Sequence, residues 1–180
     1  MEIINYDKVT RYLHWIMAVI IIYATAAGYV MHLVIDSHPP VFNFLSVMNM
    51  SLATVGSGVF VVRWAWKYFR PTRAFSNDKL PHWQLSAAHM IHGIIYQLMF
   101  VVFISGFLML ETSYPLFWLV EIPNLINSRE INSFFFMVHR YACASLAVVI
   151  ALHACAALKH HFVAKNQVLL RMMGRAKQRI

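Results

Sequence analysis

Two histidines, His139 and His153, lie at the two ends of an apolar stretch in which the only charged residue is Arg140. In an α-helix, fourteen residues fall about 40° short of four full turns and rise about 21 Å, so both rings point to nearly the same face. His14 lies near the start of an earlier apolar stretch. If the two stretches are antiparallel, His14 and His153 lie at the same depth. Two facing neutral imidazoles are the axial ligands that a b-type haem requires.

The three histidines taken together argue against a purely structural role or a zinc site. A single histidine in an apolar helix more often forms a hydrogen bond to a neighbouring helix or lies at the membrane interface. Polar groups within such helices usually have a function, and here three of them agree in depth and face. A zinc ion needs its ligands within a few ångströms of one another, and His139 is too far from His153 for that.

The elements that must position these histidines are four apolar stretches. The chain has 180 residues, of which 60% are hydrophobic and 12% are charged, fewer charges than a soluble domain carries. Each stretch is long enough to cross a hydrocarbon core about 30 Å thick as a helix. They cover roughly residues 12–34, 43–66, 86–110 and 132–158. We expect one all-α integral membrane domain over residues 1–180, a four-helix bundle with up-down-up-down connections.

Basic residues are concentrated on one side of the predicted bundle. The net charge is +8, and thirteen of the fifteen Lys and Arg residues lie before the first stretch, around the loop between the second and third, or after the fourth. The charged residues on the other side are Arg129, Arg140, Asp36, Glu111, Glu121 and Glu130. This positive-inside pattern places both termini in the cytoplasm. The basic excess then serves orientation and contact with anionic lipid headgroups, and we expect no nucleic-acid partner.

Five motifs resemble the bacterial cytochrome b561 family over nearly the whole chain. RYLHWIMA matches the His-Trp of the family's first helix, VVRWAWKYFRP the end of its second and AAHMIHGIIY the start of its third. LFWLVEIPNL matches its outer loop, and HACAALKHHFVAKNQVLLRMMGR matches the exit of its fourth helix and the tail. The resemblance implies a multi-pass protein of the bacterial inner membrane that binds haem b. It implies that His14 and His153 ligate the iron of an inner haem, and that His139 ligates that of an outer haem.

The second helix departs from the family pattern at the outer haem. The resemblance implies that the partner of His139 is a histidine fourteen residues before Arg63. That position is Asn49, and the second apolar stretch contains no histidine. Asparagine is a poor ligand for haem iron, so the second axial ligand has to be sought elsewhere.

Several ligand sets stay open for the outer haem. Met48 or Met50 could supply a thioether after a change of helical register, which would give His–Met ligation and a raised potential. His32 lies five turns from His14 on the same face, about 27 Å along the helix, which places it farther out than the fourth-helix pair requires. An outer haem with one axial ligand, or no outer haem at all, completes the alternatives.

Four further residues are candidates for contacts with a haem propionate or a quinone. His89 and His92 begin the third stretch at the inner side, three residues apart and therefore on one face. His160 follows His153 by two turns, and a histidine can pass protons at cellular pH. For these three, hydrogen bonding at the interface is the simpler alternative. Arg140, beside His139, either pairs with a propionate or is an ordinary interfacial residue.

The resemblance implies electron transfer between ubiquinone and an unidentified outer donor or acceptor. In the superoxide-oxidising branch of the family the outer substrate is superoxide, which would make the protein a superoxide:quinone oxidoreductase. Attracting an anion needs a positive outer potential, whereas the outer loops carry four acids and two arginines. Three other classes stay open: a cytochrome b subunit that anchors a larger respiratory oxidoreductase, a proton- or metal-linked transporter, and a structural anchor.

Overall fold

Four long helices make up most of the protein. A computed structural model describes residues 5–69 and 81–176. The helices are α1 (Lys8–Val34), α2 (Pro39–Phe69), α3 (His82–Leu108) and α4 (Arg129–Phe162), and each is long and apolar enough to cross a membrane. This confirms the predicted all-α membrane bundle. Each helix begins about one turn before the predicted stretch, because polar residues in the headgroup region do not end a helix.

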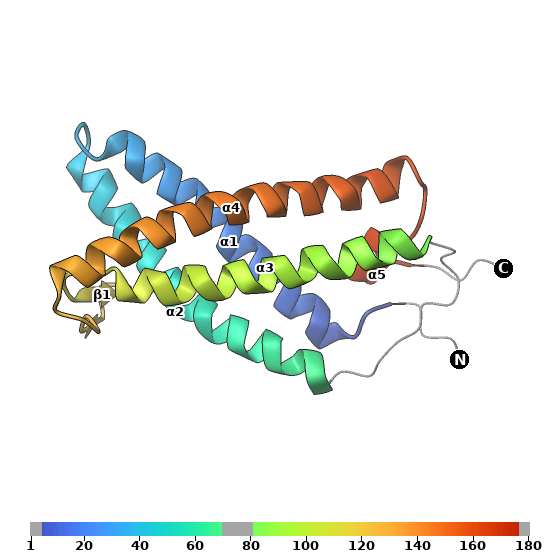
Figure 1. Cartoon of the computed structure of the whole chain (residues 1–180), viewed down its shortest axis with the longest axis horizontal. Coiled ribbons are helices and arrows are strands. Elements are labelled where there is room, and N and C mark those ends of the chain that lie inside the picture. Colours follow the sequence, from blue (N-terminus) through green and yellow to red (C-terminus); the bar gives the residue numbers. More distant parts are fainter. Residues whose placement is uncertain (1–4, 70–80, 177–180) are drawn as a thin grey trace.

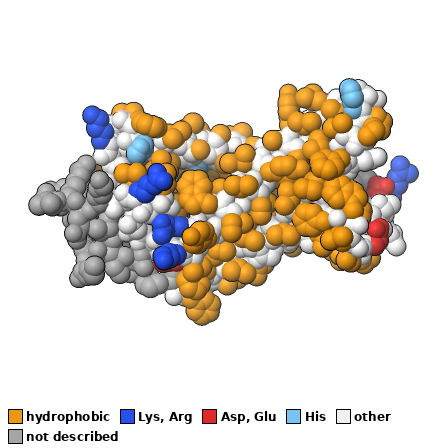
Figure 2. All heavy atoms as spheres, turned by 180° about the vertical axis from the view of Figure 1, so that it is seen from behind, with side chains coloured by type: hydrophobic (Ala, Val, Ile, Leu, Met, Phe, Trp, Pro, Cys, Tyr) orange, Lys and Arg blue, Asp and Glu red, His pale blue; other side chains and the backbone are white. Residues whose placement is uncertain are grey.

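The helices alternate in direction, so their connections fall at two ends of the molecule (Figure 1). We call the end at which α1 and α3 begin the basic end. The end that holds the α1–α2 turn and the α3–α4 connection is the acidic end. Most Lys and Arg side chains in this view lie toward the basic end and most acidic side chains lie at the acidic end, with broad apolar surface between them (Figure 2). Asp7, at the start of α1, is an acidic residue of the basic end. Five basic residues of the predicted inner side lie outside the described residues: Arg70, Arg73, Lys79, Lys177 and Arg179.

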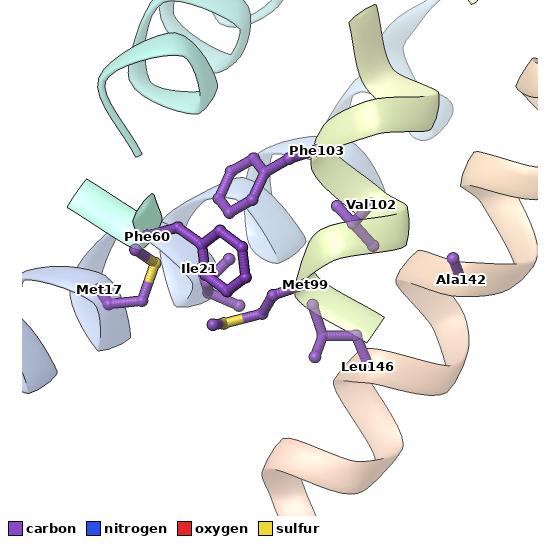
Figure 3. Packing of buried hydrophobic residues seen from close by; sticks show 8 residues of the cluster. All are labelled: Met17, Ile21, Phe60, Met99, Val102, Phe103, Ala142 and Leu146. Atoms are coloured by element: carbon purple, nitrogen blue, oxygen red, sulfur yellow. The ribbon is translucent and has the colours of Figure 1, made fainter. Parts of the chain in front are cut away.

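The four helices form two helical hairpins. Helix α1 packs along α2 and α3 packs along α4, and in the part of the chain that the structure describes, the two hairpins approach each other closely only at isolated points. An apolar cluster fills the middle of the bundle between them (Figure 3). Its members are Met17, Ile21, Phe60, Met99, Val102, Phe103, Ala142 and Leu146. In α4 this layer falls between His139 and His153, so it separates two polar sites.

Gly56 of α2 permits the close approach of three helices in this layer. A Cβ at position 56 would lie 3.0 Å from Cγ2 of Ile20 in α1 and 3.4 Å from the ring of Phe103 in α3. Small residues allow helix backbones to pack at short distance within a membrane. The close contact fixes which face of α2 points to the interior.

The connection between α3 and α4 contains a short antiparallel β-hairpin. Strands β1 (Tyr114–Leu116) and β2 (Val120–Ile122) pair in the register Leu116 to Val120. The hairpin packs against α2, where the backbone N–H of Phe117 donates to Oγ of Ser51 (2.7 Å). The hydroxyl of Tyr114, which is 2% exposed, shares a hydrogen bond of 2.7 Å with Oγ1 of Thr54. The hairpin therefore caps the acidic end of the bundle.

A short last helix, α5 (Val168–Met173), folds back onto the basic end. It packs against α4, and the indole N–H of Trp15 in α1 donates to the carbonyl of Met172 (3.3 Å). Gly174 ends α5 in the left-handed conformation (φ +74°), which glycine adopts without strain. The segment after α4 is thus held against the start of α1.

Candidate functional site

His14 of α1 and His153 of α4 face each other near the basic end. Their ring centroids lie 6.5 Å apart, with the ring planes crossing at 66°. A metal–imidazole bond of about 2.0 Å places the iron about 3.1 Å from each ring centroid, so two axial imidazoles have centroids about 6.3 Å apart. The observed separation matches this value and is too long for a direct hydrogen bond between the rings. The donor pair fits a haem iron between them.

His92 of α3 joins this inner site. Its ring centroid lies 5.1 Å from that of His153, and its side chain is exposed in the protein alone. His89 lies one turn nearer the basic end on the same helix and is also exposed. An exposed histidine next to His153 is placed to contact a cofactor or substrate rather than to complete the apolar core. His92 is therefore the better placed of the two for such a contact.

Arg63 is a member of the inner site that the sequence did not single out. Its Nη2 donates to Nδ1 of His14 (3.1 Å) and its Nε donates to the hydroxyl of Tyr96 (3.0 Å). Its Nη1 is buried without a hydrogen-bond partner. A buried, charged donor without a partner is costly, and a haem propionate is a strong acceptor of opposite charge. The only sequence signal is that Arg63 lies two turns after Gly56 on the interior face of α2.

His160 lies two turns beyond His153, closer to the end of α4. Its Nδ1 is 2.8 Å from Nδ2 of Asn166, which follows α4 in the chain. The amide N–H₂ can only donate, so Nδ1 accepts and the ring proton is on Nε2. The contact orients the His160 ring at the basic end. No ring contact joins His160 to His14, His92 or His153 among the residues described.

His139 of α4 occupies a second polar site, nearer the acidic end. Its Nδ1 lies 3.0 Å from the carbonyl of Val102 in α3, to which it donates, and 3.2 Å from Oγ of Ser105. This leaves the lone pair on Nε2, which lies 3.4 Å from Sγ of Cys143 one turn further along α4. Gly106 makes room for the ring, since a Cβ there would lie 3.2 Å from Cε1 of His139. A carbonyl that fixes the ring nitrogen not bound to iron is the usual support of a histidine ligand.

The candidate partners of His139 differ in their surroundings. Met48, Asn49 and Met50 are half-buried in α2, whereas His32 is exposed near the end of α1. Oδ1 of Asn49 is buried and has no hydrogen-bond partner. Within the described ranges no hydrogen bond joins His139 to any of these four side chains.

Arg140, the candidate for a propionate of the outer haem, is exposed in α4 beside His139. Its exposure fits either a propionate at the rim of the outer site or the membrane interface, so both readings of the sequence stand. The described residues contain no group of three His, Cys, Asp or Glu side chains suited to holding one metal ion. His14 and His153 form a facing pair from different helices, and His139 stands apart from them.

Comparisons with known proteins identify the family of this chain. A family model described as prokaryotic cytochrome b561 matches residues 5–175. Cytochrome b561 homolog 2 of Escherichia coli K12 is 25% identical over 176 residues, which cover 96% of this chain and 93% of that protein. Cytochrome b561 homolog 1 of the same organism is 30% identical over 100 residues, 54% of this chain and 57% of that protein. The family match includes all four helices and both histidine sites.

Proposed function

The chain belongs to the prokaryotic cytochrome b561 family and is a haem b electron-transfer cytochrome of the membrane, and from this premise we propose that His14 and His153 hold an inner haem b that exchanges electrons with a quinone. The observation that carries the proposal is the 6.5 Å separation of the two rings, which leaves the space of one iron between them. Bound haem b supplies one-electron redox chemistry, and the protein supplies ligation, orientation and exclusion of water.

Each residue of the inner site then has a definite task. His14 and His153 bind from helices of different hairpins, so the ligand pair ties the hairpins together. Arg63 neutralises a propionate with its unpartnered Nη1. The apolar layer around Phe60 and Phe103 keeps water from passing along the bundle. A dry site with fixed charges holds the potential of a bound group within a narrow range.

We place the protein in the bacterial inner membrane with its basic end facing the cytoplasm, as its charge indicates. The quinone site then lies at this basic end. Reduction of ubiquinone consumes two electrons and two protons. His92 lies beside His153, and His160 carries its ring proton on Nε2 because Asn166 occupies Nδ1. These rings, with His89 nearby, are placed to pass protons to a reduced quinone. Electrons arrive from an outer donor at the acidic end.

Superoxide is one candidate for that donor. Two superoxide anions would lose one electron each, giving two molecules of oxygen, and ubiquinone would take up both electrons with two protons. The acidic end carries Asp36, Glu111, Glu121 and Glu130. Such a surface repels an anion and slows its arrival. A neutral or cationic donor therefore suits this outer face better than superoxide does.

The haem content of the detergent-purified protein tests the ligand assignment. Pyridine haemochrome assay and reduced-minus-oxidised spectra should detect haem b in the wild type. His14→Ala and His153→Ala should each remove the inner haem, because its two ligands come from different hairpins and the loss of either one separates the haem from one hairpin. His38→Ala is the matched control, because His38 is exposed in the α1–α2 turn and, among the described residues, its ring bonds only to Ser37. A colourless wild-type protein, or full haem content in both variants, would contradict the assignment.

A further inference from the structure

We propose that the outer haem is held by His139 alone, and that its open axial position faces the amide of Asn49 and accepts a small uncharged ligand such as a diatomic gas. The inference rests on the proposed function, since it requires a haem-binding protein. It departs from two-histidine ligation, which the second helix cannot provide because α2 contains no histidine.

Asn49 lies at the centre of the interior face of α2. Positions 49, 56, 60 and 63 fall within about 60° of one another on a helical wheel. Gly56 packs against Ile20 and Phe103, and Arg63 reaches His14. The ring of Phe60 is tilted against that of Phe103, with centroids 5.6 Å apart. Asn49 therefore points between the hairpins, in the direction of the outer site. Its buried Oδ1 has no partner there, as expected of a polar group that faces a bound ligand or water.

The β-hairpin fixes the rotation of α2 around this position. The N–H of Phe117 donates to Ser51, which is fully buried, and the hydroxyl of Tyr114 bonds to Thr54. Both contacts lie on the side of α2 away from Asn49, about 140–200° around the helix. Met48 and Met50 each lie about 100° from Asn49, so neither can replace it at the centre of the interior face unless α2 turns. The two hairpin contacts oppose such a turn.

The remaining candidate, His32, is also poorly placed. It is exposed near the end of α1. His139 by contrast is oriented as a ligand would be, with Nδ1 donating to the Val102 carbonyl and Gly106 leaving space for the ring. The lone pair of its Nε2 meets the weak thiol donor of Cys143 at 3.4 Å, a contact that haem iron would replace. A haem with a histidine ligand on one side and only the uncharged amide of Asn49 on the other has an open axial position. The polarity and hydrogen-bonding groups of such an open side decide which small ligand binds.

Carbon monoxide is the probe that tests the open position. It binds ferrous haem that has a vacant axial position and does not displace two strong histidine ligands. We expect the dithionite-reduced wild type to hold two haems per chain and to bind about one carbon monoxide per two haems. Asn49→His should keep both haems and weaken carbon monoxide binding by roughly tenfold or more. Asn43→His is the matched control, because Asn43 is an exposed asparagine of the same helix, and it should bind carbon monoxide like the wild type.

Further measurements separate the two haems and do not depend on one variant. His139→Ala should leave one haem and abolish carbon monoxide binding. His14→Ala should remove the inner haem and preserve carbon monoxide binding. The oxidised wild type should show a high-spin ferric signal in its EPR spectrum. Two haems without carbon monoxide binding, a single haem per chain, or carbon monoxide binding that survives His139→Ala would each overturn the inference while leaving the inner haem assigned. A protein without haem would instead overturn the proposed function.

Discussion

At the scale of single residues, the hydrogen bond between Arg63 and His14 depends on whether His14 binds a haem iron. An arginine can only donate, so Nδ1 of His14 accepts the contact at 3.1 Å. Ligation through Nε2 requires the ring proton on Nδ1, which then has no lone pair to offer. In the proposed inner site, haem ligation by His14 would break this contact and release a second guanidinium donor in addition to the unpartnered Nη1. The haem propionates are the natural acceptors for both.

Arg63→Gln should lower the midpoint potential of the inner haem. A positive charge favours the reduced haem, and at about 8 Å with an effective dielectric constant of about 20 it contributes about 2 kcal/mol. That corresponds to about 90 mV for one electron, and solvent and the propionates reduce it. We expect a decrease of roughly 30–90 mV in a spectroelectrochemical titration. Arg140→Gln, at the other end of α4, should leave this potential unchanged, and an unaltered potential in Arg63→Gln would remove Arg63 from the inner site.

At the scale of elements, Asp7 ties the start of α1 to the end of α2. Its carboxylate accepts from the N–H and the hydroxyl of Thr10 (2.9 and 2.7 Å) and from the indole N–H of Trp66 (3.2 Å). Burial raises the pKa of Asp7, but the hydrogen bonds from Thr10 and Trp66 together lower it by more. The pKa of Asp7 is therefore below its usual value. A lowered pKa in the folded state means that the charged form stabilises the fold.

Asp7→Ala should destabilise the protein at neutral pH by about 1 kcal/mol, the usual cost of losing an N-cap. The stabilisation is complete above the unfolded pKa of about 3.9 and is lost as the pH falls through the lower pKa of the folded state. The difference in thermal midpoint between wild type and variant should therefore be constant from pH 7 to about pH 5 and shrink below about pH 4. Asp36→Ala in the exposed α1–α2 turn is the control. A difference that grows on acidification would mean that the sign is wrong.

Gly56 and Gly58 offer a test of the packing between the hairpins. Gly56→Leu forces a side chain against Ile20 and Phe103, whereas a Cβ at position 58 meets nothing within 4 Å. Overpacking of a core usually costs about 1–3 kcal/mol. We expect Gly56→Leu to lower the midpoint of thermal haem loss and Gly58→Leu to leave it unchanged or raise it. Equal midpoints would show that the contact around Gly56 is not tight.

The elements also show which features the sequence could predict. The four helices follow from long apolar stretches, and the pairing of His14 with His153 follows from their depth and face. The β-hairpin could not be predicted, because its turn places Phe117 and Trp118 at φ +48° and +60°, where glycine or asparagine is usual. That conformation is held by a contact with Ser51, 66 residues away. The role of Arg63 likewise depends on packing against Tyr96, which no local pattern reveals.

At the scale of the whole molecule, the protein is an apolar bundle with ends of opposite charge. Most basic side chains lie at the end with His14, His92 and His153, and most acidic ones lie at the end that the β-hairpin caps (Figure 2). The apolar layer between them separates the two histidine sites. This polarity gives the two sites different surroundings. For the proposed quinone reaction, the lipid phase would supply the quinone and the adjacent water would supply the protons. The direction of insertion therefore decides which compartment provides the protons.

The inserted orientation is open to a direct test with single cysteines. Ser37→Cys lies in the exposed α1–α2 turn at the acidic end, and Val163→Cys follows α4 at the basic end, where the native residue is 73% exposed. Because basic residues are retained in the cytoplasm, a membrane-impermeant maleimide added to intact cells should label Ser37→Cys and should label Val163→Cys only after permeabilisation. The wild type is the control, since Cys143 and Cys155 lie within α4. Labelling of Val163→Cys in intact cells would place the inner haem and its proposed quinone site on the outer side of the membrane, and protons for quinone reduction would then be drawn from outside.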